Sequence, residues 1–180
     1  VPNWQLGSSG GNFLLAGQKG EDAVLFNRIA IRIRLDTDNR RVILTQCDIS
    51  HGEIGIAGSG SLDYSGTEAR LTLGMAATPM PVSVLKRIWP ILVAPEVREW
   101  TIERVDKGTL QQLDVAINAP THTLVRGGPP IPDEGLSINF LANNVTIRPV
   151  DDMPAVRDGD MKGRISGRTV NVTVAQGGIE

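Results

Sequence analysis

The chain has 180 residues, which fits one domain because domains average about 150 residues, and 18 basic against 20 acidic residues give a net charge of −2. Nucleic acid is therefore not expected as a partner, since binding it needs a basic excess. Apolar residues make up 41% and charged residues 21%, which excludes disorder along the whole chain. The one cysteine, Cys47, excludes an internal disulfide and a CxxC pair. No apolar run reaches the roughly 18 residues of a membrane-spanning helix. Because the chain begins at Val1 rather than at methionine, we expect a processed protein or an excerpt of a longer one.

Alternating apolar and polar residues predict β-strands along most of the chain. The clearest case is the segment 28–35, in which isoleucine and leucine occupy one face and arginines most of the other. Further segments with this period of two residues are 13–16, 54–56, 71–75, 113–117, 136–149 and 170–174. Turn-forming clusters between them are 36–41, 58–61, 64–67 and 158–160. Short connections of this kind predict an antiparallel β-meander.

Two short helices are predicted between residues 82 and 106. Apolar residues with helical spacing in the first are Leu85, Ile88, Trp89 and Leu92. Pro90 is expected to end or kink it. The second is placed at about 95–106, because Pro95 suits a first helical position and Gly108 a cap after the last turn. Its expected apolar residues are Val97, Trp100, Ile102 and Val105. We expect both helices to cover one side of the sheet.

The composition divides the chain into three parts. Residues 1–119 are predicted to form a β-meander with a helical insert at about 82–106. Residues 120–135 are rich in proline and glycine, which favours a long loop because neither a helix interior nor a central strand accommodates proline. Residues 136–180 are predicted to form a β-rich tail that continues the sheet. The predicted fold class is mainly β with a small α insert (α+β).

No catalytic residue, metal site or cofactor is expected. Residues 7–11 match the GxSxG string of hydrolase nucleophile elbows, but that geometry needs a buried strand before it and a helix after it, and a flexible turn is favoured instead. His51 and His122, the two histidines, are predicted at a strand end and in a loop. They cannot form a tetrahedral zinc site with one cysteine alone. We therefore predict that the chain is not an enzyme.

Two segments carry motifs that identify a family. Within residues 81–117 the motifs are LKRIWP at 85–90, APEVREW at 94–100 and GTL at 108–110. They resemble the helical insert of AsmA-like envelope proteins, and the YhdP-type proteins, with their central domain of unknown function, are the most similar members. The motifs of the tail are VTIRP at 145–149, MPAV at 153–156, the glycines at 159 and 163, and GR at 167–168. They resemble the repeated strand, proline turn and strand of the same family.

This resemblance implies part of a long protein that is anchored in the inner membrane of a Gram-negative bacterium and extends through the periplasm. Its curved, taco-like antiparallel sheet would form a groove that conducts phospholipid between the inner and outer membranes and supports outer-membrane integrity. The implied partners are phospholipid acyl chains and neighbouring repeats of the parent chain. Candidates for the groove lining are Ile29, Ile31, Ile33, Leu35, Leu71, Leu73 and Met75. Candidates for the helical cover are Leu85, Ile88, Trp89, Val97 and Trp100.

Other functions are compatible with the same pattern. Ordinary core packing also produces aliphatic strand faces, so a structural spacer or a protein-interaction β-domain of the envelope without lipid binding stays open. An adhesin or carbohydrate-binding β-domain is expected to hold more aromatic residues than the 4% found here. Edge strands of an excerpt can pair with another chain, which leaves the oligomeric state open.

Overall fold

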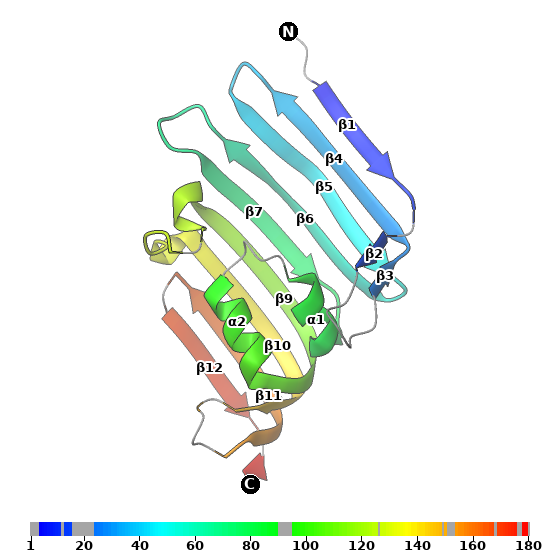
Figure 1. Ribbon diagram of the computed structural model, residues 1–180, viewed down its shortest axis with the longest axis vertical. Coiled ribbons are helices and arrows are strands. Elements are labelled where there is room, and N and C mark those ends of the chain that lie inside the picture. The colour runs from blue at the N-terminus through cyan, green and yellow to red at the C-terminus, as the bar shows by residue number, and fades with distance from the viewer. Residues whose placement is uncertain are drawn as a thin grey trace.

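The computed structural model describes residues 4–11, 13–15, 24–89, 95–125, 127–148, 150, 154–167, 169–175 and 178–179. The protein consists mainly of one antiparallel β-sheet with two short helices against one face (Figure 1). The sheet is open, because its first and last strands do not pair with each other. The predicted mainly-β fold with a small helical insert is thereby confirmed.

The strand order in the main sheet follows the chain. In spatial order the strands are β1 (Trp4–Ser9), β4 (Arg28–Asp36), β5 (Arg41–His51), β6 (Ile54–Asp63), β7 (Arg70–Ala77), β9 (Val105–Pro120), β10 (Leu136–Ile147), β11 (Val156–Ser166) and β12 (Thr169–Ala175). The short strands β8 (Met80–Pro81) and β13 (Gly178–Ile179) pair with β9 and β11. A separate two-stranded sheet joins β2 (Phe13–Leu15) to β3 (Val24–Phe26). Antiparallel pairing of successive strands needs only short connections.

The turn between β4 and β5 forms where the sequence predicts it, at residues 37–40. The carboxylate of Asp36 accepts hydrogen bonds from the backbone N–H of Asn39 at 3.1 Å and from its side-chain amide at 3.0 Å. Arg40 takes a left-handed conformation with φ of 51°. A short polar side chain thus holds the turn closed and fixes the register of the two long strands that it joins.

Two other predicted turns are wrong, because the residues that suggested them lie inside strands. Residues 58–61 lie within β6, where a Cβ atom on Gly60 would stand 2.3 Å from the backbone oxygen of Thr72. Glycine there allows close approach of two strands rather than a turn. Residues 158–160 lie within β11, beside an irregularity in its register with β10.

The two helices are α1 (Val82–Ile88) and α2 (Pro95–Arg104). Pro95 begins α2 as predicted, but the chain passes from Arg104 directly into β9, so Val105 is a strand residue. The predicted cap at Gly108 is wrong, since Gly108 lies within β9 against Val145. Leu92 and Pro90 lie outside the described residues.

Lys86 fastens the two helices to each other. Its ammonium group donates hydrogen bonds from α1 to the backbone oxygen of Ile102, at 3.1 Å, and to that of Val105. These carbonyls belong to the last turn of α2 and the residue after it, where the helix dipole favours a cation. The insert is therefore held as a unit on the sheet.

The core lies between the helices and the strands β9, β10 and β11. One cluster of buried residues comprises Met80, Val82, Leu85, Val105, Leu110, Ala142, Val145, Ile147 and Met161. The other comprises Val115, Ile117, Ala119, Leu124, Leu136, Ile138 and Ile165. Leu124 belongs to the connection between β9 and β10, residues 121–135, which contains the 3₁₀ helices η1 (Thr121–Thr123) and η2 (Asp133–Gly135). Among the described residues before Met80, Phe26 is the one buried hydrophobic side chain. The well-packed part of the sheet is thus its second half.

Candidate functional site: an aliphatic sheet face

The strand register brings all seven groove candidates onto one face of the sheet. Ile33 stands opposite Leu44, and Leu44 opposite Gly60. Gly60 in turn stands opposite Leu73. Residues directly opposite in antiparallel strands point to the same face, as do residues two apart along one strand. The candidates that share this aliphatic face are Ile29, Ile31, Ile33, Leu35, Leu71, Leu73 and Met75.

The aliphatic face continues across the whole sheet. From β7 it passes to β9, where Leu73 stands opposite Ile117. At one edge Leu6 of β1 stands opposite Ile33, and at the other edge Val170 of β12 stands opposite Ile165. A sheet normally needs a second layer of protein over an aliphatic face. The function that this face can serve therefore depends on which of its parts the rest of the chain covers.

Coverage of the aliphatic face is uneven. Over β9 and β10 the helices remove it from water, and Ile138 is only 2% exposed. Over β4 and β5, Figure 1 shows no helix among the described residues, and the two-stranded sheet β2–β3 lies at their lower end, where β3 contacts β5 and Phe26 is buried. The aliphatic residues there are half-buried and belong to neither core cluster. We call them the open strip: Ile29, Ile31, Ile33, Leu35, Val42, Leu44, Cys47, Ile49 and Leu62.

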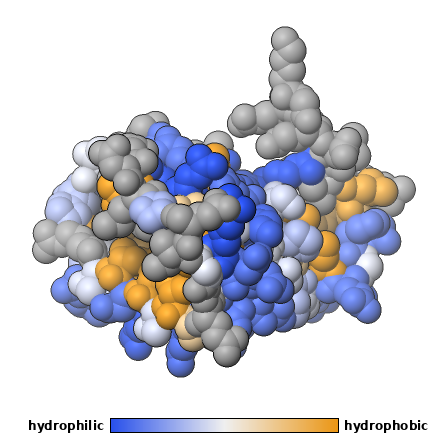
Figure 2. All heavy atoms as spheres, turned by 90° about the horizontal axis from the view of Figure 1, so that it is seen from below, coloured by the Kyte–Doolittle hydropathy of each residue, from blue (hydrophilic) through white to orange (hydrophobic). Residues whose placement is uncertain are grey.

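The seven groove candidates therefore fall into two groups. The four of β4 lie in the open strip. The three of β7 are half-buried and pack against the second core cluster at the border of the helical cover. A view along the sheet from its lower end shows hydrophobic surface in separate patches with hydrophilic residues between them (Figure 2). Apart from the end that β3 contacts, β4 and β5 offer the part of the aliphatic face that the described residues cover least.

The sequence analysis missed the contribution of β5 because of a β-bulge. Arg32 pairs with Gln46 but Ile33 pairs with Leu44, which leaves Thr45 as an extra residue. Leu44 and Cys47 consequently share one face although they are three residues apart. Alternation with one inserted residue after Leu44 is the signal that could have revealed this strand, since a bulge shifts the face of every later side chain.

Four of the five residues predicted for the helical cover lie in or against the core clusters. Leu85 is buried in the first core cluster, while Ile88, Trp89 and Val97 are half-buried against the clusters. Trp100 differs from the expectation, because it is 41% exposed. The less exposed positions of α2 include Val97, Thr101 and Arg104, which follow helical spacing, so the helix is rotated away from Trp100.

A crevice of about 40 Å³ lies between α1 and the sheet, lined by apolar residues that include Ile56, Met75, Leu85 and Trp89. One water molecule occupies about 30 Å³ in the liquid, so this crevice is too small for an acyl chain. A hydrocarbon chain would have to lie on the open strip instead.

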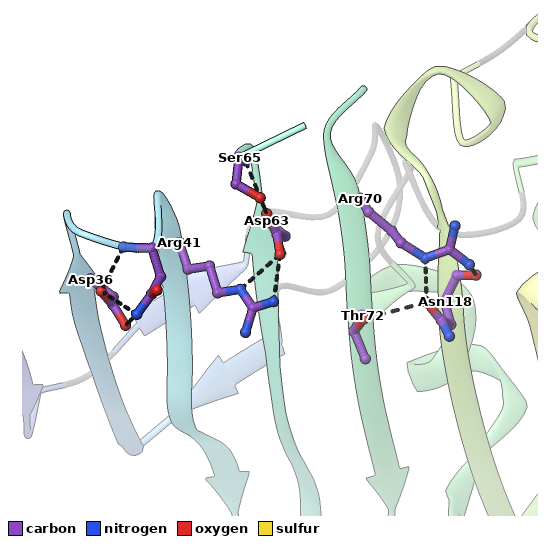
Figure 3. Close-up of polar contacts among 8 residues, drawn as sticks. Asp36, Arg41, Asp63, Ser65, Arg70, Thr72 and Asn118 are labelled. Carbon is purple, nitrogen blue, oxygen red and sulfur yellow. Dashed lines mark hydrogen bonds and ion pairs between the residues drawn. The ribbon is translucent and has the colours of Figure 1, made fainter. Parts of the chain in front are cut away.

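The opposite face of the sheet is polar, and its side chains bind one another (Figure 3). Arg41 donates from Nε and Nη2 to one carboxylate oxygen of Asp63, both at 2.7 Å. Asp63 also accepts hydrogen bonds from the hydroxyl and backbone N–H of Ser65, and these bonds, with those from Arg41, lower the pKa of Asp63 to about 2. Farther along, Arg70 donates to the side-chain oxygen of Asn118 at 2.7 Å. This row ties β5 to β6 and β7 to β9.

A shallow depression of about 570 Å³ lies on the polar face, above β5, β6, β7, β9 and β10. Its floor includes small residues such as Ala57 and Gly74, and its polar groups include the carboxylates of Asp48 and Asp114. Asp48 accepts a hydrogen bond from Gln46, and Asp114 accepts one from Gln112 at 2.6 Å. Carboxylates and amides cannot shield hydrocarbon, so this depression is not a site for acyl chains.

The groups considered for chemistry lie apart. Ser9 ends β1, an exposed edge strand that is followed by β2 rather than by a helix. Burial raises the pKa of the Cys47 thiol, with a further contribution from Asp48, which keeps the thiol protonated at neutral pH. His122 lies 4.0 Å from the carboxylate of Glu68 on the surface. Within the described part of the chain, histidine, cysteine, aspartate and glutamate form no group of three or more able to hold a metal ion.

Comparisons with protein-family models, curated proteins and solved structures gave no match to this chain. Among the helices that the structure describes, none has the length and apolar character needed to cross a membrane.

Proposed function

We propose that this chain is a periplasmic module of an AsmA-like protein and that it conducts phospholipid without enzymatic chemistry. In this proposal the acyl chains lie on the aliphatic face and the headgroups stay in water. The observation that carries it is the open strip, an aliphatic surface on two long neighbouring strands over which no described helix lies. The resemblance of the tryptophan and proline motifs to AsmA-like proteins supplies the class of ligand and the location.

The dimensions of the open strip suit a hydrocarbon chain. A strand rises about 3.3 Å per residue, so the nine residues of β4 extend over roughly 30 Å, which exceeds the length of one acyl chain because such a chain spans about half of a bilayer's hydrocarbon core of roughly 30 Å. Each methylene group that leaves water contributes about 0.8 kcal/mol, so contact along only part of this length gives useful affinity. A taco-like curvature that brings β4 toward the helices would turn the open strip into a groove and shield a second side of the chain.

Native mass spectrometry of the purified, detergent-free chain tests this proposal. We expect adducts with the mass of phospholipid, confirmed by extraction and analysis of the lipid. Ile31→Asp places a carboxylate in the middle of the open strip and should abolish the adduct while the circular dichroism spectrum stays unchanged. Arg32→Gln is the matched control, because it changes the net charge by the same amount on the same strand but on the polar face. It should retain the lipid.

Two results would contradict the proposal. A folded chain that carries no phospholipid even after incubation with phospholipid vesicles has no lipid-binding face. An Ile31→Asp variant that unfolds, beside a stable Arg32→Gln variant, would identify Ile31 as part of a closed core.

The alternative function is a structural spacer or a protein-interaction domain of the envelope. It is favoured by the continuation of the aliphatic face to both edge strands, where Leu6 and Val170 are exposed. Added strands would cover these residues in a longer sheet. This alternative predicts a clean protein mass without lipid.

A further inference from the structure

The edge strand β12 lacks the features that normally prevent strands from pairing with another chain. All seven of its residues, Thr169–Ala175, are exposed. Its sequence, TVNVTVA, contains no charged residue and no proline, which are the usual protections of an edge. Alternating valines of this kind have high β-propensity and no net charge, a composition that favours strand addition.

The exposed valines of β12 all belong to the aliphatic face. Val170, Val172 and Val174 are 59%, 41% and 44% exposed. In the register with β11 they stand opposite Ile165, Gly163 and Met161, of which Ile165 and Met161 are core residues. The aliphatic face therefore extends to the edge formed by β12. A strand added beside β12 would bury one side of these three valines.

The sequence of β12 is complementary to itself when it is reversed. In an antiparallel pair centred on Val172, this valine meets its own equivalent and Val170 meets Val174 of the second copy. On the polar face Asn171 meets Thr173 of the second copy, and at the ends the small residues Thr169 and Ala175 meet. A twofold axis perpendicular to the sheet produces this pairing and keeps both aliphatic faces on the same side. Opposite residues then match in character at every position.

We propose that β12 pairs with β12 of a second copy of this chain, antiparallel and centred on Val172, so that two sheets join into one. The other edge fits a second copy less well. Centring β1 on Leu6 would place Trp4 opposite Ser8, an apolar residue opposite a polar one. Pairing of β12 with β1 of a second copy in a head-to-tail stack would be parallel, because the nine antiparallel strands of the path leave both edges running in the same direction.

The interface is small, since one strand pair buries less than the roughly 800 Å² per partner of a standard interface. We therefore expect a dimer that forms with rising concentration, within about 1 to 100 µM. Sedimentation velocity of the 180-residue chain should show the mass doubling over this range. Val172→Lys places two ammonium groups opposite each other at the twofold axis and should leave a monomer at every concentration.

Leu6→Lys is the matched control, because it introduces the same charge on the aliphatic face of the opposite edge. It should dimerise as the unaltered chain does. A chain that remains monomeric throughout the range overturns the proposal. So does a dimer that Leu6→Lys abolishes and Val172→Lys preserves, which would assign the interface to β1. Pairing of β12 with some other polypeptide is distinguished by the mass of the complex, and that result overturns the proposal as well.

Cysteine crosslinking tests the register independently of the lysine variants. In a Cys47→Ser background, Val172→Cys should give a covalent dimer under mild oxidation, since opposite Cα atoms in an antiparallel pair lie within disulfide range. Val170→Cys alone should not crosslink, whereas Val170→Cys combined with Val174→Cys should. Crosslinking by Val170→Cys alone would show a different register and overturn the assignment of the axis to Val172.

Discussion

Truncation of two isoleucines on the same sheet face measures how much of that face is covered. Ile138 of β10 is 2% exposed beneath the helices, in the second core cluster. Ile138→Ala leaves a closed cavity, for which we expect a loss of about 3 kcal/mol, within the usual 2 to 5 kcal/mol for such a change. Ile31 of β4 is half-buried in the open strip. Ile31→Ala removes three carbon groups worth about 0.8 kcal/mol each at full burial, so its partial burial predicts about 1.5 to 2 kcal/mol.

Urea denaturation, monitored by tryptophan fluorescence, measures both losses of unfolding free energy, since the chain holds three tryptophans. In a separate thermal scan, each kcal/mol shifts the melting temperature of a protein of this length by about 2 to 4 °C, so we expect roughly 6 to 12 °C for Ile138→Ala and about 3 to 8 °C for Ile31→Ala. The slope of the unfolding free energy against urea concentration should be unchanged in both variants. Equal losses of about 3 kcal/mol would refute the reasoning, because Ile31 would then be packed as tightly as Ile138 and the open strip would be unavailable to lipid.

Two further predictions concern the close packing and the polar face. Gly60→Ala should destabilise the fold by about 2 kcal/mol or more, because the new methyl group would stand 2.3 Å from the oxygen of Thr72, whereas Gly74→Ala, with no atom within 4 Å, should cost less than 0.5 kcal/mol. Thermal denaturation compares them, and equal melting temperatures would contradict the assigned clash. Asp63 has its pKa lowered from 3.8 to about 2, chiefly by Ser65, so its stabilising effect is present above about pH 4 and is lost as the pH falls toward 2. Asp63→Asn should weaken that part of the acid transition, and an identical transition in both proteins would argue against it.

Strands were predictable from the sequence where alternation runs unbroken. Segment 28–35 shows the period without a defect, and it forms β4 with all four of its groove candidates on one face. In β5 the extra Thr45 moves Cys47 and Ile49 onto the face that the even-numbered Val42 occupies. A rule of strict alternation cannot detect a strand with such a bulge, because it expects one face to keep one parity.

The structural roles of the glycines and the ends and orientation of the helices were predictable only in part, because the same residue pattern occurs in two different structures. Gly58 and Gly60 resemble turn residues, yet neighbouring strands approach them so closely that a Cβ atom on either would contact the chain across the gap. Gly108 resembles a helix cap, but Val145 packs against it inside the sheet. Trp100 has the right spacing for the buried side of α2, and the rotation of this short helix on the sheet, which sequence alone does not contain, leaves it exposed.

The described helices cover only part of the aliphatic face, and this uneven cover limits the functions that the face can serve. The described helices reach only the second half of the sheet, and they suffice to bury both core clusters. The isoleucines of β4 contribute little to those clusters, although threonine would satisfy the β-propensity of a face in water. The partly buried Ile29, Ile31 and Ile33 are the side chains that the proposed lipid would remove further from water. A spacer would require a second protein layer over β4 and β5, whereas a lipid conduit requires only the hydrocarbon chain, and extraction of the purified chain distinguishes the two by the presence of phospholipid.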